Sequence, residues 1–338
     1  MKNLILTTFL CLSACFVFSQ NTDSAQFYFK KGTEAKDARL FAVAGKNFDR
    51  AIQLDKNYTE AYIENGKVNL EMRKVDAALG NFTKAYQLQP NNNDVVKELS
   101  SLYFNNRQFQ KAIDLVQKCS NCPDADRIMG MSYYELEDYA KAVNFLQKAI
   151  AKNDKDGESA YTLGRTYLEL ENEKSAIPQF QTAVALEPSR NTWMYELGLI
   201  YYNQDDYKSA LKYFTMAGNA GYTKTNDFNE NVGFSQIYTG DVPAGMKALA
   251  EIMQKKPNNT ELLNNIAQAM YDTKHYDDAI SYYEKLLTIN PKDARSLFMA
   301  GMTFQKKGDK EKGQKICDKA IEMDPSLASH RQKQELPM

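Results

Sequence analysis

Apolar residues recur with helical spacing in pairs of short segments, and these pairs follow one another along most of the chain. Residues 157–190 give the plainest example: two segments of roughly a dozen residues, each apolar on one face, are joined by a tight turn. Gly164 and Ala176 lie where two antiparallel helices would cross, and Phe180 would fill the space beside them. Because neither helix can bury its apolar face alone, the pattern predicts that each pair stacks on its neighbours.

The spacing of these marker residues is constant along the chain. The small residue of the first segment is Gly32, Gly66, Ser100, Gly130, Gly164, Gly198, Gly233, Ala267 or Gly301. Its small companion, twelve residues later, is Ala44, Ala78, Ala112, Ala142, Ala176, Ala210, Gly245, Ala279 or Gly313. We therefore predict nine repeats, over residues 25–58, 59–92, 93–122, 123–156, 157–190, 191–225, 226–259, 260–293 and 294–327.

These marks resemble the tetratricopeptide repeat, a helix–turn–helix unit of about 34 residues. The residues that carry the resemblance are Leu163, Gly164, Tyr167, Ala176, Phe180, Ala183 and Pro188. The sequence departs from the family at Ala160, where the family usually has Trp. The resemblance implies an all-α fold, a right-handed superhelical α-solenoid of about nine repeats in one continuous array.

Three places depart from the regular pattern. The third repeat is about four residues short and ends in Cys119-x-x-Cys122. The sixth carries Gly218 to Tyr222 in place of the usual helix end, which predicts a flexible point. Pro178 lies inside a predicted helix and is expected to shorten or bend it.

The chain ends lie outside the repeats. Residues 1–19 have the features of a secretory signal peptide, with Lys2 before an apolar run and a cleavage site before Gln20. A second interpretation is a bacterial lipobox that would make Cys15 a lipidated first residue. Both predict an exported protein of the cell envelope, periplasmic or, if lipidated, anchored in the outer membrane. Residues 20–24 are read as a short linker and residues 328–338 as a tail or short capping helix.

Export places the remaining cysteines where disulfides can form. Cys119 and Cys122 are read as a local disulfide or two inert thiols, with redox chemistry as the alternative, because the pair ends a second helix rather than starting one. Cys317 occupies a core position of the last repeat and is expected to be buried.

Charge and motifs exclude several classes of function. The 42 Lys and Arg residues balance 43 Asp and Glu residues, and no basic stripe is present, so we expect no nucleic-acid partner. The two histidines, His275 and His330, are too few and too far apart for a metal site or a His-based triad. Phosphate-binding and metalloprotease motifs do not occur in the sequence. We expect no enzymatic activity, no cofactor and no metal.

The resemblance implies that the first helix of each repeat lines an inner, concave wall. Candidate partner-binding residues at or beside the inward positions of repeats four to seven are Arg127, Met131, Tyr134, Tyr161, Arg165, Tyr195, Leu199, Tyr202, Phe234 and Tyr238. Tyr, Arg and Met are enriched at interface hot spots. The alternative is structural, because the family often carries Tyr at two of these positions as ordinary packing.

Family members that grip chaperone C-termini use a clamp of Lys, Asn and Arg spread over three first helices. Here Ser101 follows Lys97 where Asn is needed, Ile128 fills the next site, and Glu158 stands where Lys is needed. A free C-terminus is therefore not the expected ligand.

We predict a monomeric, non-catalytic protein–protein interaction scaffold that holds a protein or peptide segment in its concave groove. The first alternative is a lipid-anchored outer-membrane assembly factor that would touch the membrane only through Cys15. The second is a thiol oxidoreductase that depends on Cys119 and Cys122.

Overall fold

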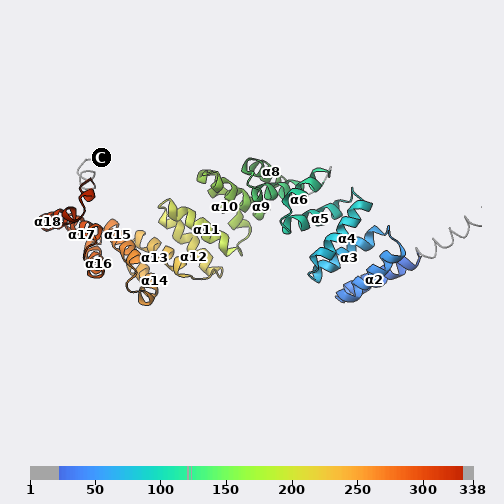
Figure 1. Ribbon diagram of the computed structural model, residues 1–338, viewed down its shortest axis with the longest axis horizontal. Coiled ribbons are helices and arrows are strands. Elements are labelled where there is room, and N and C mark those ends of the chain that lie inside the picture. The colour runs from blue at the N-terminus through green and yellow to red at the C-terminus, as the bar shows by residue number, and fades with distance from the viewer. Residues whose placement is uncertain (1–22, 120–121, 123, 330–338) are drawn as a thin grey trace, which may run out of the picture. The chain divides into compact units, whose positions relative to one another are not determined.

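The computed structural model describes residues 23–119, 122 and 124–329. Within these residues the chain is helical throughout, with no strand, and the predicted all-helical repeat architecture is confirmed. Helices follow one another in antiparallel pairs (Figure 1). The predicted signal peptide, the lipidation site at Cys15 and nearly all of the predicted tail lie outside the described residues.

The chain divides into two compact units, residues up to Gln179 and residues from Phe180 onward. The single continuous array over residues 25–327 stays a prediction from the sequence. The boundary falls inside α10 (Glu173–Leu186), which contains Pro178 and yet has 14 residues, as most of the second helices do, so the expected shortening is wrong.

The first unit holds four complete helix pairs and the start of a fifth. They are a helix over residues 23–37, α2 (Phe41–Leu54), α3 (Thr59–Glu71), α4 (Val75–Leu88), α5 (Asn93–Asn105), α6 (Phe109–Gln117), α7 (Ala125–Glu135), α8 (Tyr139–Lys152) and α9 (Gly157–Glu169). Residues 23 and 24, assigned to a linker from the sequence, already belong to the first helix.

The second unit continues with four pairs and a short 3₁₀ helix after α10. They are α11 (Asn191–Asn203), α12 (Tyr207–Asn219), α13 (Asn226–Tyr238), α14 (Val242–Lys255), α15 (Thr260–Asp272), α16 (Tyr276–Ile289), α17 (Ala294–Lys307), α18 (Lys310–Met323) and η1 (Pro325–Leu327).

Side-chain caps explain where many helices begin. Asp156 precedes α9, and its carboxylate accepts a hydrogen bond of 3.0 Å from the Ser159 backbone N–H, which would otherwise lack a partner. The same cap recurs at Asp138, Asp206, Asp241, Asn259, Asp293 and Asp309.

Small residues let the two helices of a repeat approach each other. A Cβ atom added to Gly66 of α3 would lie 2.7 Å from the ring of Phe82 of α4, so glycine is needed at this crossing. The same arrangement joins Gly32 to Phe48, Gly130 to Leu146, Gly198 to Phe214, Gly233 to Leu249 and Gly301 to Cys317. The large partners are buried and form the core between helices.

The turn inside each repeat contains one residue in the left-handed region. These residues are Arg39, Arg73, Arg107, Glu137, Glu171, Asp205 and Lys274, with φ between 53° and 66°, and Gly240 and Gly308 at the equivalent positions. Sequence reasoning did not find this feature, because charged residues rather than glycine occupy most of the turns.

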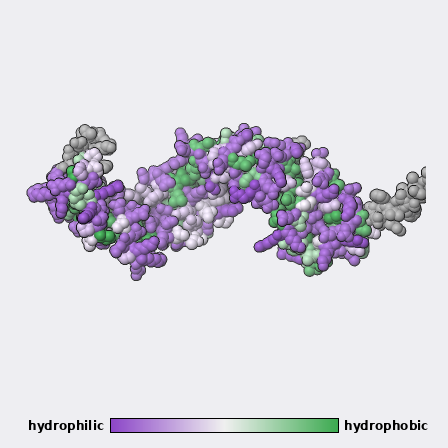
Figure 2. All heavy atoms as spheres, viewed as in Figure 1, coloured by the Kyte–Doolittle hydropathy of each residue, from purple (hydrophilic) through white to green (hydrophobic). Residues whose placement is uncertain are grey.

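Each unit has a distinct inner surface, which we define as the solvent-facing side of its first helices. In the first unit α5 contacts α7 and α7 contacts α9; in the second, α11 contacts α13 and α13 contacts α15. First helices of successive repeats thus approach one another directly, which makes their side the inner one in each unit. Hydrophilic residues cover most of the face visible in Figure 2.

Candidate functional site

The ten candidate residues fall into both units. Arg127, Met131, Tyr134, Tyr161 and Arg165 lie on α7 and α9 of the first unit, and Tyr195, Leu199, Tyr202, Phe234 and Tyr238 lie on α11 and α13 of the second. Each inner surface is therefore described by itself.

Ion pairs between successive repeats occupy the inner surface of the first unit. Arg127 pairs with Glu158 and lies 3.3 Å from the Asp156 carboxylate, between Nε and Oδ2. One repeat earlier, Lys97 Nζ lies 3.0 Å from Asp124 Oδ2. The lysine and arginine of this surface therefore already hold carboxylates of the same chain.

Arginine also covers tyrosine rings in the first unit. The guanidinium carbon of Arg165 lies 5.5 Å from the ring centroid of Tyr134 and 6.0 Å from that of Tyr161. This is the geometry of a cation–π contact, in which a cation meets the negative face of the ring. Met131 and Tyr134 pack against the core around Leu146, and burial raises the pKa of Tyr134.

Tyr195 belongs largely to the framework of the second unit. Its ring stacks on Tyr222 with centroids 4.4 Å apart and lies 5.4 Å from Phe214. Its hydroxyl accepts a 2.9 Å hydrogen bond from the Asn231 side chain on α13. Most contacts of the Tyr195 side chain are therefore packing contacts within the chain, as in the alternative that these tyrosines are structural.

Three tyrosines from three helices form a cluster at the inner surface of the second unit. The rings of Tyr207 and Tyr238 stack with centroids 4.2 Å apart, and Tyr202 meets Tyr207 edge to face at 5.3 Å. All three side chains are partly exposed. We call Tyr202, Tyr207 and Tyr238 the tyrosine cluster; Leu199, also partly exposed, precedes Tyr202 on α11.

Carboxylates surround the tyrosine cluster. The Tyr207 hydroxyl donates a 2.7 Å hydrogen bond to Asp205 Oδ1, and the Tyr238 hydroxyl donates one of 3.3 Å to Asp272 Oδ2. Burial, followed by the charges of Glu230 and Asp205, raises the pKa of Tyr202 to about 12. The pKa values of Tyr207 and Tyr238 are also raised, first by burial. All three hydroxyls therefore remain protonated at neutral pH.

Glu230 of α13 lies near carboxylates from its own helix and the next repeat. Burial raises its pKa, and the charges of Asp227 and Glu261 add to this, while Lys256 acts in the opposite direction. Neutral or positively charged neighbours would stabilise the ionised form of this carboxylate more than its present neighbours do.

Phe234 is a correction to the predicted surface. Its side chain is only 5% exposed and belongs to the core cluster that includes Ile237 and Ile266. Leu199, one repeat earlier at the equivalent position, remains partly exposed. Phe234 therefore offers almost no surface to a partner.

Sequence reasoning missed Tyr207, because it counted only first helices. A signal was nevertheless present: an aromatic residue near the end of the first helix is followed five residues later by another at the start of the second. The structure brings these pairs together at Phe104 and Phe109, Tyr134 and Tyr139, Tyr202 and Tyr207, and Tyr271 and Tyr276.

The three cysteines in the described residues differ in bonding and burial. Cys119 and Cys122 form a disulfide after α6, and Cys122 is 9% exposed against the core of the first unit. Cys317 is fully buried. No group of histidine, cysteine or carboxylate side chains suited to a metal ion occurs in the part of the chain that the structure describes.

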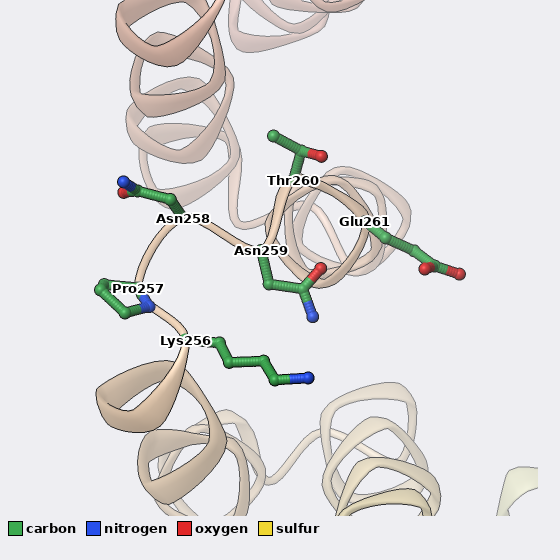
Figure 3. Close-up of a pocket in the computed structure, with 6 residues that line it drawn as sticks. All are labelled: Lys256, Pro257, Asn258, Asn259, Thr260 and Glu261. Carbon is green, nitrogen blue, oxygen red and sulfur yellow. The ribbon is translucent and has the colours of Figure 1, made fainter.

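A polar hollow of about 560 Å³ opens at the loop between α14 and α15. Figure 3 shows Lys256, Asn259 and Glu261 extending to one side of this loop, and Pro257 and Asn258 to the other. A second hollow, of about 350 Å³, lies between α13 and α14 and is lined by residues that include Asn229, Lys247 and Glu251.

No described helix is both long and apolar enough for a membrane span.

Family comparisons agree with this architecture. A family model of the tetratricopeptide repeat matches residues 161–222, and two further models of the same repeat match residues 260–293 and 294–327. A model of subunit 3 of the anaphase-promoting complex, or cyclosome, matches residues 71–149.

Individual relatives match only parts of the chain. The DnaJ protein P58IPK homolog B of Oryza sativa subsp. japonica is 25% identical over 178 residues, which cover 47% of this chain and 38% of the rice protein. The mitochondrial import receptor subunit TOM70 of Homo sapiens is 31% identical over 96 residues, which cover 27% of this chain and 16% of the human protein. The chain thus spans less than half the length of these curated relatives.

Among solved structures, YrrB, a TPR protein with an unusual peptide-binding site, superposes with a TM-score of 0.40 at 24% identity. The superposition covers 56% of this chain and 97% of YrrB.

Proposed function

Because the chain belongs to the tetratricopeptide-repeat family, a family of protein-interaction scaffolds, we propose that it binds a segment of a partner protein on the inner surfaces of its repeats and catalyses no reaction itself. The binding residues in this proposal are Tyr161 and Arg165 in the first unit and Leu199, Tyr202 and Tyr238 in the second.

The observation that carries the proposal is the partial exposure of large side chains along the first helices. Tyr161, Leu199, Tyr202 and Tyr238 are neither buried in the core nor fully exposed. Partly exposed aromatic side chains can bury further apolar area against a partner while their polar tips remain hydrated.

We further propose that this scaffold works outside the cytoplasm, in the cell envelope. The apolar run after Lys2 and the cleavage site before Gln20 support this location. A lipid anchor at Cys15 is the second possibility for the same segment. Mass spectrometry of the protein from its native cell decides between them, because a chain beginning at Gln20 excludes lipidation at Cys15, and a diacylated N-terminal cysteine excludes simple cleavage.

Site-specific photo-crosslinking tests the inner surfaces directly. The full chain is expressed in its native cell with benzoylphenylalanine in place of Met131 or Leu199, which lie on first helices. Matched controls carry the same probe in place of Lys148 of α8 or Lys208 of α12, which are exposed on second helices. We expect a protein adduct from Met131 or Leu199 and none from the controls.

The opposite distribution would overturn the proposal. Adducts formed only from Lys148 or Lys208 would assign binding to the second helices. Circular dichroism of each labelled chain must show wild-type helix content, so that a lost adduct reports a lost contact and not unfolding.

A further inference from the structure

The two inner surfaces differ in whether lysine and arginine side chains of the same chain contact their carboxylates and tyrosine rings. In the first unit, basic side chains bridge successive repeats: Lys36 Nζ lies 2.6 Å from Glu64 Oε2, Lys97 pairs with Asp124, and Arg127 pairs with Asp156 and Glu158. Arg165 lies over the rings of Tyr134 and Tyr161. This unit therefore supplies its own cations, both to the carboxylates and to the tyrosine rings.

Among the described residues, the tyrosine cluster of the second unit and the carboxylates around it lack such cations. Among the described residues, no ion pair involves Asp205, Asp227, Glu230, Glu261 or Asp272. No described lysine or arginine lies over the ring of Tyr202, Tyr207 or Tyr238. At the position equivalent to Arg165, one repeat later, the second unit has Leu199.

The charges that act on this surface are nearly all negative. Asp205 and Glu230 act on Tyr202, and Asp205 and Asp272 act on Tyr238. Asp227 and Glu261 act on Glu230, and the one opposing charge is Lys256, at the edge of the hollow in Figure 3. Five carboxylates and one ammonium group thus act on Tyr202, Tyr238 and Glu230.

We propose that the tyrosine cluster of the second unit binds a lysine or arginine side chain of an extended partner segment, with Glu230 and Asp272 as its carboxylate partners. This inference deepens the proposed function and rests on it. A cation over the Tyr238 and Tyr202 rings repeats the contact that Arg165 makes within the first unit, and it places a positive charge among carboxylates that lack one. Leu199 offers an apolar contact beside it for the rest of the segment.

A selection of phage-displayed random peptides on the immobilised full chain tests this inference. We expect the selected peptides to be enriched in lysine and arginine. A synthetic peptide from the selection should bind the Glu230→Gln, Asp272→Asn and Tyr238→Leu variants about three- to tenfold more weakly, because each change removes one partner of the cation. Added salt should weaken binding to the wild type.

Two matched controls separate local from general effects. Glu322→Gln removes one exposed carboxylate from α18, and Tyr167→Leu removes one partly exposed tyrosine from the first unit. Neither should change the affinity. Because Tyr238→Leu alters packing, Glu230→Gln is the decisive variant: Glu230 takes part in no ion pair among the described residues, and its loss relieves repulsion.

Three results would overturn the inference: selected peptides without a basic preference, no selected peptide at all, or equal affinity for all variants. If Leu199 nevertheless forms a crosslinked adduct with a protein, the proposed scaffold function stands and only the basic partner is wrong.

Discussion

Gly245 of α14 approaches Gly233 of α13 so closely that a Cβ atom on Gly245 would lie 2.5 Å from the Gly233 carbonyl oxygen. Seven of the nine repeats carry alanine at the position of Gly245, so an alignment of the repeats alone would favour alanine there. The backbone geometry argues the opposite, because the added methyl group would meet a carbonyl oxygen and the side chain of Ile237. In this repeat both crossing residues are glycine, and the backbones of α13 and α14 are too close for a side chain on Gly245.

We therefore expect Gly245→Ala to lower the free energy of unfolding by about 1–3 kcal/mol, the usual cost of overpacking a core. Gly80→Ala is the matched control, because Gly80 lies in α4 and a Cβ atom there would meet nothing within 4 Å. That change should raise stability by about 0.5–1 kcal/mol through helix propensity. Urea unfolding followed by circular dichroism measures both, and a neutral Gly245→Ala would contradict the packing argument.

The turn glycines give a second prediction, which depends on backbone conformation and not on steric contact of an added side chain. Gly240 has φ of 97°, and a Cβ atom there would meet nothing within 4 Å. Gly240→Ala should still destabilise the chain by about 1 kcal/mol, because L-residues are strained in this region. At the equivalent turn, Lys274→Gly should be neutral or slightly stabilising, since it relieves strain at φ of 66°. Thermal unfolding of the wild type and both variants measures these effects. A Gly240→Ala variant that melts at the same temperature as the wild type would contradict the argument from strain.

Tyr283 provides a test of a buried polar atom. Its side chain is fully buried in the core of the second unit, and its hydroxyl has no hydrogen-bond partner among the described residues. Tyr283→Phe should therefore raise the free energy of unfolding by up to about 1 kcal/mol, because an unpaired hydroxyl is costly to bury. Tyr195→Phe is the control with the opposite sign, since it removes the bond from Asn231 and should cost about 1 kcal/mol. A loss of stability in Tyr283→Phe would show that its hydroxyl is satisfied in solution.

The repeat spacing was sufficient to predict the helix pairs and the glycine crossings, because both depend on residues close together in the sequence. Tyr202 and Tyr238 could be placed on inner surfaces for the same reason. The tyrosine cluster could not be predicted, because Tyr207 comes from a second helix and Asp272 reaches Tyr238 only when successive repeats stack. The burial of Phe234 likewise depends on how α13 packs in the core cluster with α15.

The tyrosine cluster finally predicts how stability depends on alkaline pH. Burial and nearby carboxylates raise the pKa of Tyr202 from 10.0 to about 12, so the folded chain keeps a proton that the unfolded chain releases. The resulting contribution to stability is complete below pH 10 and is lost as the pH rises through about 12. Tyr202→Phe cannot titrate, so its free energy of unfolding should fall less steeply than that of the wild type over this range. Urea unfolding between pH 9 and pH 12 measures both slopes. Parallel curves for Tyr202→Phe and the wild type would mean that Tyr202 ionises as readily in the folded chain as in the unfolded one.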